Sequence, residues 1–176
     1  MTFLEIRNAL ISLLSKHMGM KITLAEQIHP VKQLPYCYYS VLTPYAPIGE
    51  MGDYSIRPSS KDSGVISTRR EMPHATFSFT FVSQSRYVNC GTFVYGEDEA
   101  QQMAEQAQGY FLHVGYDELS RLGIVVVEIR NVTNRTTLVV DEDVRRYGFD
   151  VRIRYTRTDE REDATVGSVS LKRKEK

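Results

Sequence analysis

The residues that could support metal or nucleophilic chemistry are few and scattered along this chain. None of its four histidines has a second type of metal ligand nearby at the spacing of a zinc motif: His17, His29, His74 and His113. Cys37 and Cys90 form no CxxC pair, and a zinc site needs several close ligands. Cys37 stands in a tyrosine-rich stretch, where a cysteine more often packs as a small hydrophobic residue than acts as a nucleophile. We therefore expect no metal centre.

Catalytic signatures are also missing. The sequence contains no G-x-S-x-G elbow, no P-loop and no G-x-G-x-x-G fingerprint. The acidic run Asp141, Glu142 and Asp143 lacks the alternating oxygen ligands, central glycine and closing glutamate of a calcium-binding EF-hand. These acids are either solvated or paired with the arginines that follow, Arg145 and Arg146. The sequence predicts no catalytic residue and no cofactor, and hence a protein that is not an enzyme.

A charged, alternating segment follows the acidic run. From 147 to 155 the odd positions are apolar or aromatic, whereas the even positions include Asp150, Arg152 and Arg154. Strict alternation is typical of a half-buried β-strand, here with arginines on its outer face. Two explanations stay open: a solvated face with local ion pairs, which are common and weak, or a surface that meets acids of another protein.

Bulk composition narrows the class of protein. A length of 176 residues indicates one domain. Lysine plus arginine and aspartate plus glutamate number 22 each, so the net charge is zero. A dedicated nucleic-acid binder usually has a clear basic excess, because neutralising phosphates supplies much of its affinity. The composition therefore argues against such a module.

The sequence also argues against membrane insertion and secretion. No apolar run approaches the ~18 residues that a membrane-spanning helix needs. Glu5 and Arg7 interrupt the apolar pattern at the amino terminus, as they would not in the core of a signal peptide. We expect a protein made and kept in the cytoplasm, with reduced cysteines.

Two helices are predicted. Thr2 and Glu5 fit a capping box at the start of the first, and Gly19 suits its end. The apolar stripe of this helix is Ile6, Ala9, Leu10, Leu13 and Leu14. A second helix begins at about Glu97, where a cluster of acids favours the helix dipole. Its predicted buried stripe is Ala100, Met103, Ala104, Ala107, Phe111 and Val114.

Several segments have the character of strands. Residues 36–43 are rich in tyrosine and β-branched residues. Residues 74–83 alternate, with three phenylalanines on one face. Residues 123–131 are apolar on both faces at their start, which predicts a central position in the sheet. The segment from 147 is the last long strand, and "TVGSVSL" at 165–171 can pair as an edge strand once a neighbour is available.

Residues 44–73 differ from the rest of the chain. They are rich in prolines and polar turn signals and have no sustained period. A loop of about 30 residues is unusual in a compact domain and is commonly functional, disordered or an extended hairpin. The stretches "DYSIR" and "GVISTRRE" can pair across "PSSKDSG". We therefore predict a projecting, hairpin-like arm.

Together these elements predict an α+β fold. It consists of a mixed, mostly antiparallel β-sheet with two helices packed on one face, a long β-hairpin-like arm and an extended C-terminal tail. The expected organisation is a single domain over residues 1–157, from which 44–73 project, followed by a polar tail over 158–176.

Four stretches form an ordered pattern: "LPYCYYSVLTPYAPIG", "HATFSFTFVSQS", the alanine-rich helix at 97–114 and "IRNVTNRTTLVVDEDVRRYGFDVRIRY". This pattern resembles the neck terminator, or tail-terminator-like, proteins of tailed phages and prophages. The similarity spans residues 2 to about 157. Its most specific part is the order of "NVTNR", "DE" and "RRYGFDVRIR".

The resemblance implies a structural protein of the virion neck, at the head–tail junction, made in the cytoplasm of the bacterial host. Such proteins share an α+β fold and form a ring, commonly a hexamer, at the head-proximal end of the tail. The ring halts growth of the tail tube and joins the tail to the head connector. The implied partners are other copies of the chain, the tail tube protein and a head-side connector, adaptor or stopper protein. The genome passes through the channel without specific binding, and no enzymatic residues are implied.

In such a ring the outward-facing arginines gain a candidate partner. The contact between subunits is heterologous, so one surface meets a different surface of the neighbour. Arg152 and Arg154 can meet the acids at 141–143 of the next subunit, and complementary charge then sets the register. The candidate interface residues are Arg69, Arg70, Asp141, Glu142, Asp143, Arg145, Arg146, Arg152 and Arg154.

Three other functions are kept as alternatives. A head–tail stopper or tail-completion factor would bind the head-side adaptor rather than the end of the tail tube. A small cytoplasmic enzyme would turn over a substrate in a broad screen. A nucleic-acid-binding module would bind DNA with an affinity that falls steeply with salt.

Overall fold

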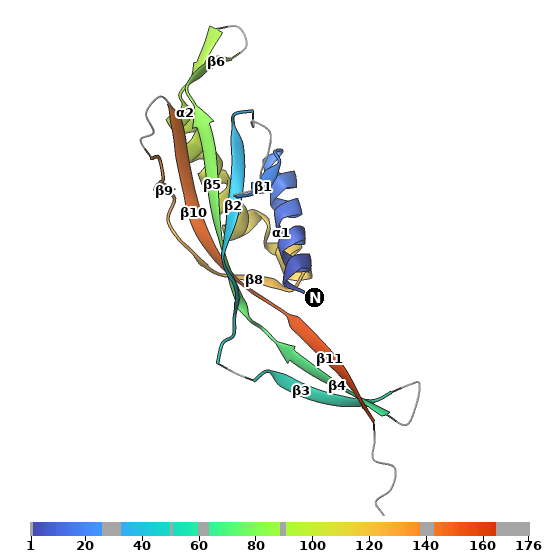
Figure 1. The fold of residues 1–176 in the computed structure, drawn as a ribbon. Coiled ribbons are helices and arrows are strands. Elements are labelled where there is room, and N and C mark those ends of the chain that lie inside the picture. The colour runs from blue at the N-terminus through green and yellow to red at the C-terminus, as the bar shows by residue number, and fades with distance from the viewer. Residues whose placement is uncertain are drawn as a thin grey trace, which may run out of the picture.

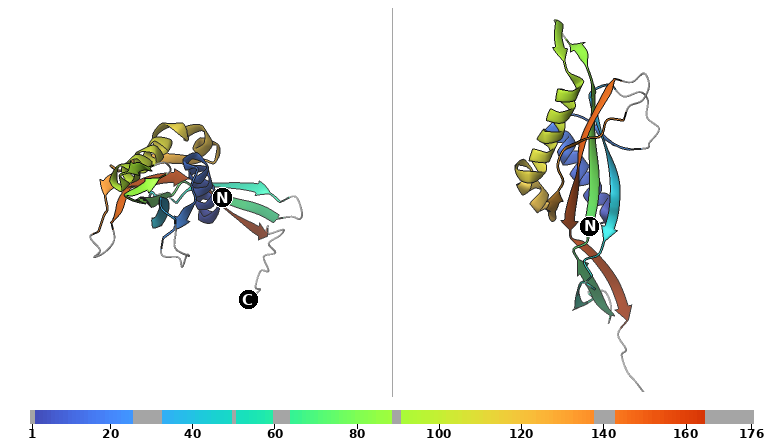
Figure 2. Two further views of the ribbon diagram at one scale, coloured as in Figure 1. Left: turned by 90° about the horizontal axis from the view of Figure 1, so that it is seen from above. Right: turned by 90° about the vertical axis from the view of Figure 1, so that its left-hand side faces the viewer.

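The computed structural model describes residues 2–25, 33–49, 51–59, 64–88, 91–137 and 143–164. They form an elongated molecule with a central sheet, an arm at one end and a small hairpin at the other (Figure 1). Two larger helices lie on one face of the central sheet and leave its other face open (Figure 2). This arrangement confirms the predicted α+β class.

The first helix, α1 (Phe3–Met18), begins and ends as predicted. The Thr2 hydroxyl accepts a hydrogen bond from the Glu5 N–H, and the Glu5 carboxylate accepts one from the Thr2 N–H, at 3.3 and 2.8 Å. Gly19 ends the helix in the left-handed conformation, with φ of 63°. The helix residues buried against the sheet are Ile6, Leu10 and Leu14.

The central sheet is mixed and mostly antiparallel, as predicted. Its strand order is β1 (Ile22–Leu24), β2 (Tyr36–Ala46), β5 (His74–Gln84), β10 (Val144–Tyr155) and β8 (Ile124–Ile129). The short β9 (Thr133–Asn134) also pairs with β10. Only β1 and β2 run parallel among these pairs.

Alternation along β5 decides which face of the sheet becomes the core. Phe77, Phe79 and Phe81 are fully buried against the helices, whereas Ser78 and Thr80 point to the opposite, open face. The helix α2 (Gly96–Gly109) packs against this layer through Ala100, Ala104 and Ala107, whose small side chains let the helix approach the sheet.

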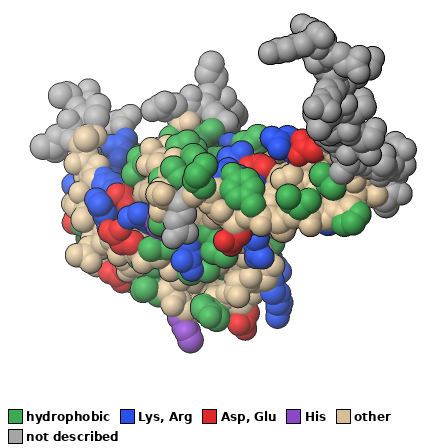
Figure 3. Space-filling view, turned by 90° about the horizontal axis from the view of Figure 1, so that it is seen from below, with side chains coloured by type: hydrophobic (Ala, Val, Ile, Leu, Met, Phe, Trp, Pro, Cys, Tyr) green, Lys and Arg blue, Asp and Glu red, His purple; other side chains and the backbone are tan. Residues whose placement is uncertain are grey.

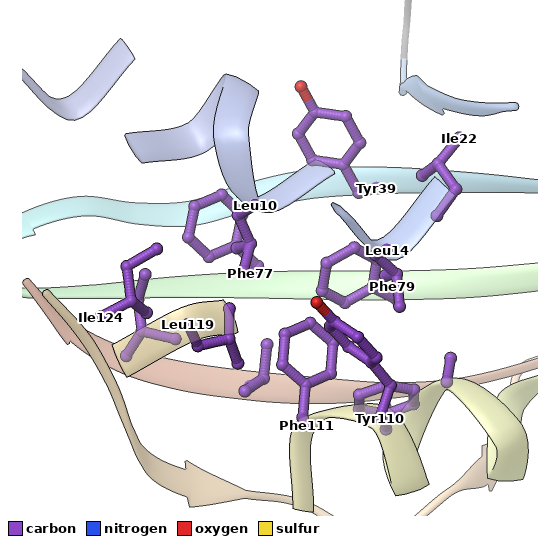
Figure 4. Packing of buried hydrophobic residues seen from close by; sticks show 14 of the residues in the cluster. Leu10, Leu14, Ile22, Tyr39, Phe77, Phe79, Tyr110, Phe111, Leu119 and Ile124 are labelled. Atoms are coloured by element: carbon purple, nitrogen blue, oxygen red, sulfur yellow. The ribbon is translucent and has the colours of Figure 1, made fainter. Parts of the chain in front are cut away.

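The chain after α2 closes one end of the core. It continues into the π-helical turn η2 (Tyr110–Val114) and a short helix, α3 (Tyr116–Arg121). Tyr110, Phe111 and Leu119 point from these turns toward the sheet, where Phe111 packs against Phe79 with ring centroids 5.5 Å apart (Figure 4). The short α3 adds a third helix to the two that were predicted.

Two predictions about burial are wrong. Val114 was assigned to the buried stripe but is 62% exposed, because the π-helical turn at Tyr110 shifts the phase of the helix. The strand β8 was predicted to be central but lies at the edge of the sheet. There Val125 is 47% exposed, so its apolar composition does not reflect burial within this chain.

The arm is a three-stranded sheet. Strands β3 (Asp53–Pro58) and β4 (Gly64–Glu71) pair antiparallel, which confirms the predicted hairpin. A third strand, β11 (Arg157–Ala164), pairs with the other edge of β4. Residues 158–164 of the expected polar tail thus belong to the arm, whereas the strand expected at 165–171 lies outside the described residues.

A small hairpin extends the opposite end of the molecule (Figure 1). It consists of β6 (Arg86–Val88) and β7 (Thr92–Val94), which pair antiparallel. This hairpin was not predicted from the sequence.

Candidate assembly surfaces

The open face of the sheet is built around an arginine that crosses it. Pairing of β9 with β10 places Arg135 beside Gly148. The Arg135 guanidinium donates hydrogen bonds to Ser78 Oγ at 2.6 Å and Thr80 Oγ1 at 3.1 Å, and it forms an ion pair with Asp150 at 2.8 Å. These contacts join the "NVTNR" stretch to the "YGFD" stretch across the open face.

Electrostatics stabilise the charged form of Asp150. Burial opposes ionisation, but the hydrogen bond from Ser78 and the nearby Arg135 outweigh it, so the pKa of Asp150 lies below its usual value. Arg135 and Asp150 are therefore satisfied within one subunit. They organise the open face rather than offer charge to a partner.

The two arginines on the outer face of β10 have different surroundings. Arg152 lies 2.8 Å from His74 Nδ1 and 3.8 Å from the carboxylate of Glu128. Arg154 forms neither an ion pair nor a hydrogen bond with any described residue, and its Nε is buried. Strand alternation puts both side chains on one face, yet only Arg152 has local partners.

The other interface candidates on and near β10 are partly engaged by their own subunit. Arg145 forms an ion pair with Asp143 at 2.9 Å. Arg146 donates a hydrogen bond to Thr137 Oγ1 at 3.3 Å. Asp141 and Glu142 lie outside the described residues. Arg145 is thus paired within its own subunit.

The base of the arm contains a buried carboxylate. Glu71 is only 7% exposed and accepts hydrogen bonds from the Tyr45 hydroxyl, 3.0 Å from each carboxylate oxygen. Arg69 lies 2.7 Å from the same carboxylate and also donates to the Met51 carbonyl. Arg157 approaches Glu71 to 3.7 Å and lies over the Tyr45 ring. These contacts join the arm to the central sheet.

A cavity of about 240 Å³ lies beside this junction, on the open side of the sheet. Arg70 and Arg154 both line it, although Arg70 is an arm residue and Arg154 belongs to the central sheet. The remaining lining residues are Ile48, Gly52, Asp53, Glu71, Met72 and Pro73. The structure thus brings together two of the predicted interface arginines that are 84 positions apart in the sequence, 154 minus 70.

The end hairpin exposes a cluster of aromatic rings. Tyr87 is 75% exposed, and its ring centroid lies 5.0 Å from that of Phe93, which in turn lies 4.9 Å from Tyr95. The sequence did not predict this surface. The alternation of aromatic residues around "NCG" was the available signal, since a glycine-containing turn between short alternating runs is typical of a hairpin.

The base of this hairpin is held in place by charged groups. Arg86 forms two hydrogen bonds with the Glu99 carboxylate, at 2.7 and 3.0 Å, and Ser83 donates a short hydrogen bond to the same carboxylate. The Arg86 guanidinium, more than burial, sets the pKa of Glu99 below its usual value. The exposed rings are therefore carried on a fixed support.

A second apolar surface follows the open edge of the sheet. A groove of about 320 Å³ runs between β8 and the turns η2 and α3. Near it Leu112, Val114 and Tyr116 are largely exposed, and Tyr116 reaches 71%. Unpaired edge strands with apolar side chains are normally covered by another element or chain. Seen from below, hydrophobic, basic and acidic side chains are interspersed over one face of the molecule (Figure 3).

The described residues contain no group of three or more histidine, cysteine or acidic side chains that could hold a metal ion. Over the same ranges no helix is long and apolar enough to span a membrane. Cys37 is fully buried, as expected of a small core residue.

Comparison with known proteins gives a family match and similar solved structures. Residues 6–173 match the family described as phage neck terminator protein. Among solved structures, a chain from the "Virion of native gene transfer agent (GTA) particle" is similar at 13% identity, with a TM-score of 0.32, over 86% of this chain and 91% of that chain. No curated protein matches. Because the family match spans nearly the whole sequence, this chain belongs to the phage neck terminator protein family and is a structural protein of the virion neck.

Proposed function

We propose that this protein closes into a ring, a hexamer in size, that ends the tail tube and joins it to the head-side connector, with DNA passing through the central channel. The observation that carries the proposal is the family match, which spans residues 6–173. The arrangement of exposed side chains supports it. An aromatic hairpin and a three-stranded arm extend from opposite ends of the molecule, and an apolar sheet edge lies between them.

These surfaces suit different partners. The open edge at β8, the open face of the central sheet and the helix layer that covers its other face are available for sideways contacts between copies. The arm and the end hairpin extend away from that layer and suit contacts above and below a ring. Exposed apolar side chains on both projections, such as Ile56 on the arm and Tyr87 on the hairpin, need a covering partner.

Ion pairs within one subunit reduce the number of arginines that are available to meet another subunit. Arg69 and Arg145 are engaged by acids of their own subunit. Arg70, which has no acidic partner among the described residues, and Arg154 remain the arginines best placed to meet another subunit. Complementary charge at such a contact sets register and partner choice more than affinity.

The ring is tested by light scattering of the purified protein at several concentrations, with negative-stain images of any large species. We expect a closed species of about six subunits, the ring size that the family resemblance implies. If the protein is monomeric, purified tail tubes are added, and rings capping the tube ends are then expected. A chain that stays monomeric and leaves the tubes uncapped contradicts the proposal. Binding to the head-side adaptor alone would assign it a stopper role instead.

A further inference from the structure

Arg154 differs from the other charged residues that the structure describes. Its Nε is buried, and the guanidinium has no hydrogen-bond or ion-pair partner among the residues with described positions. Buried polar groups in folded proteins are almost always hydrogen-bonded. The cavity that Arg154 lines also receives Arg70, a second arginine with no acidic partner in the described ranges. Two guanidinium groups that form no ion pair with a described carboxylate therefore line one cavity.

The acids of the same cavity do not satisfy Arg154. Glu71 is already held by Tyr45 and Arg69. Asp53 is opposite Arg70 in the register of the arm, but it is exposed and forms no ion pair with either arginine. Within the described ranges, Arg154 is therefore left without a carboxylate partner.

The cavity favours a carboxylate on a protein surface. Guanidinium groups bind carboxylates through paired hydrogen bonds. The other walls include Ile48, Met72 and Pro73, and Met72 is substantially exposed. Duplex DNA could not enter a space of about 240 Å³, but a single side chain could. An acid flanked by apolar residues matches both the charge and the apolar walls.

Asp117 is an acid with exposed apolar residues close to it in the sequence. Asp117 is exposed at the start of α3 and makes no hydrogen bond or ion pair with any residue whose position is described. It is close in sequence to Leu112, Val114 and Tyr116, the exposed apolar residues of η2 and α3. Since the chain has equal numbers of acidic and basic side chains, unpaired charges on one copy can be matched by those on another.

The two surfaces lie on different sides of the molecule. Arg154 is on the open face of the sheet, because it pairs in register with His74, whose neighbours Ala75 and Phe77 define the core side. Asp117 belongs to the helix layer on the other side (Figure 2). A contact between the helix layer of one copy and the open face of the next is heterologous, and its repetition gives a ring when the rotation between copies closes.

We propose that Asp117 of one subunit enters the cavity at the base of the arm of the next subunit and pairs there with Arg154 and Arg70. Leu112, Val114 and Tyr116 then pack against Ile48 and Met72 around the ion pair. This inference rests on the proposed ring and specifies the contact that closes it.

Charge exchange tests the pairing. Arg154→Asp and Asp117→Arg are each expected to reduce the fraction of protein in rings at least tenfold, and the double variant is expected to restore rings. Asp98→Arg is the matched control for Asp117, because Asp98 is also an exposed, unpaired acid in the first turn of a helix. Arg7→Glu is the control for Arg154, because Arg7 lies on α1 and is hydrogen-bonded to Asn8 of its own helix. Both controls are expected to form rings.

Circular dichroism and thermal unfolding are used to check that each variant is folded. If Arg154→Asp is not folded, Arg154→Met removes the charge with a side chain that packs well and is expected to lose rings in the same way. Wild-type rings together with unaffected single variants would overturn the pairing and leave the ring function intact. Failure of the double variant to restore rings overturns Asp117 as the partner. A wild-type chain that forms no ring, alone or on tail tubes, overturns the proposed function and the contact with it.

Discussion

Gly148 shows how a single missing side chain shapes the open face of the sheet. A Cβ at this position would meet the Phe79 carbonyl oxygen of the neighbouring strand, and it would lie 3.0 Å from a nitrogen of Arg135. Because Gly148 has no side chain, Arg135 can lie flat on the sheet and reach Asp150. The contact of Arg135 with Gly148 and Asp150 is therefore a packing arrangement, and no catalytic role is needed to explain it.

Gly148→Ala is expected to lower the free energy of unfolding by about 1–3 kcal/mol, the usual range for overpacking a tight site. Urea denaturation measures this change. Gly109→Ala is the matched control, because an added Cβ there meets nothing within 4 Å and the residue is helical. The control is expected to be neutral or to stabilise by up to about 1 kcal/mol. Equal effects of the two substitutions would contradict the packing explanation.

His74 should titrate below its ordinary pKa of 6.5, because it is partly buried and faces Arg152 and Arg154. An Nδ1 atom that accepts from Arg152 also requires the neutral ring with its proton on Nε2. As the pH falls below 6.5, the unfolded chain binds a proton more readily than the folded one, so stability decreases. NMR titration should give a pKa below 6.5, and Arg152→Gln should raise it. A value above 6.5 would contradict this electrostatic description.

The end hairpin of β6 and β7 is short for a structure that extends away from the central sheet. Two-stranded hairpins are marginally stable alone. Here Glu99 of α2 fixes the base through Arg86 and Ser83. Gly96 allows close approach to Gln84, since a Cβ would lie 2.5 Å from the backbone carbon. Contacts with α2 thus hold the base of the hairpin. Its aromatic side chains are exposed and can contact another protein.

Replacing Tyr87 and Phe93 together by serine is expected to leave the fold and the ring intact while abolishing attachment at one end of the ring. The reason is that both rings are exposed and contact each other rather than the core. Cosedimentation with purified tail tubes, and separately with heads, measures the two attachments. Leu4→Ser changes an exposed apolar residue on α1 and serves as the control. Unchanged attachment to both tubes and heads would rule out the hairpin as a contact.

Local signals predicted the elements that depend on local interactions. The capping box, the phenylalanine face of β5 and the pairing of β3 with β4 are all confirmed. The failures have tertiary causes. Strand β8 has the composition of a buried strand, but its neighbours in the sheet are set by distant parts of the chain. Strand β11 is mostly charged and lacks apolar alternation, so its pairing with β4 was not predictable from periodicity.

The sequence predicted that arginine side chains of β10 would be exposed. It did not predict which of them would lack a hydrogen-bond partner among the described residues. Alternation places Arg152 and Arg154 on one face. They differ in their surroundings, because Arg152 lies near His74 and Glu128 whereas Arg154 lines the cavity at the base of the arm. These neighbours are remote in sequence. The family match identifies a structural protein of the phage neck. Which surfaces assemble is our proposal, and the exposed side chains support it.

The third strand of the arm has a consequence for the timing of folding. Contacts between β3 and β11, such as Arg57 with Glu160 at 3.3 Å, join residues 103 positions apart. During synthesis on the ribosome, β3 and β4 emerge long before their final partner, and the arm is complete only after residues 157–164 have been translated. A chain released early would lack this strand. A ring whose contacts require the finished arm would therefore reject truncated subunits without any separate quality-control factor.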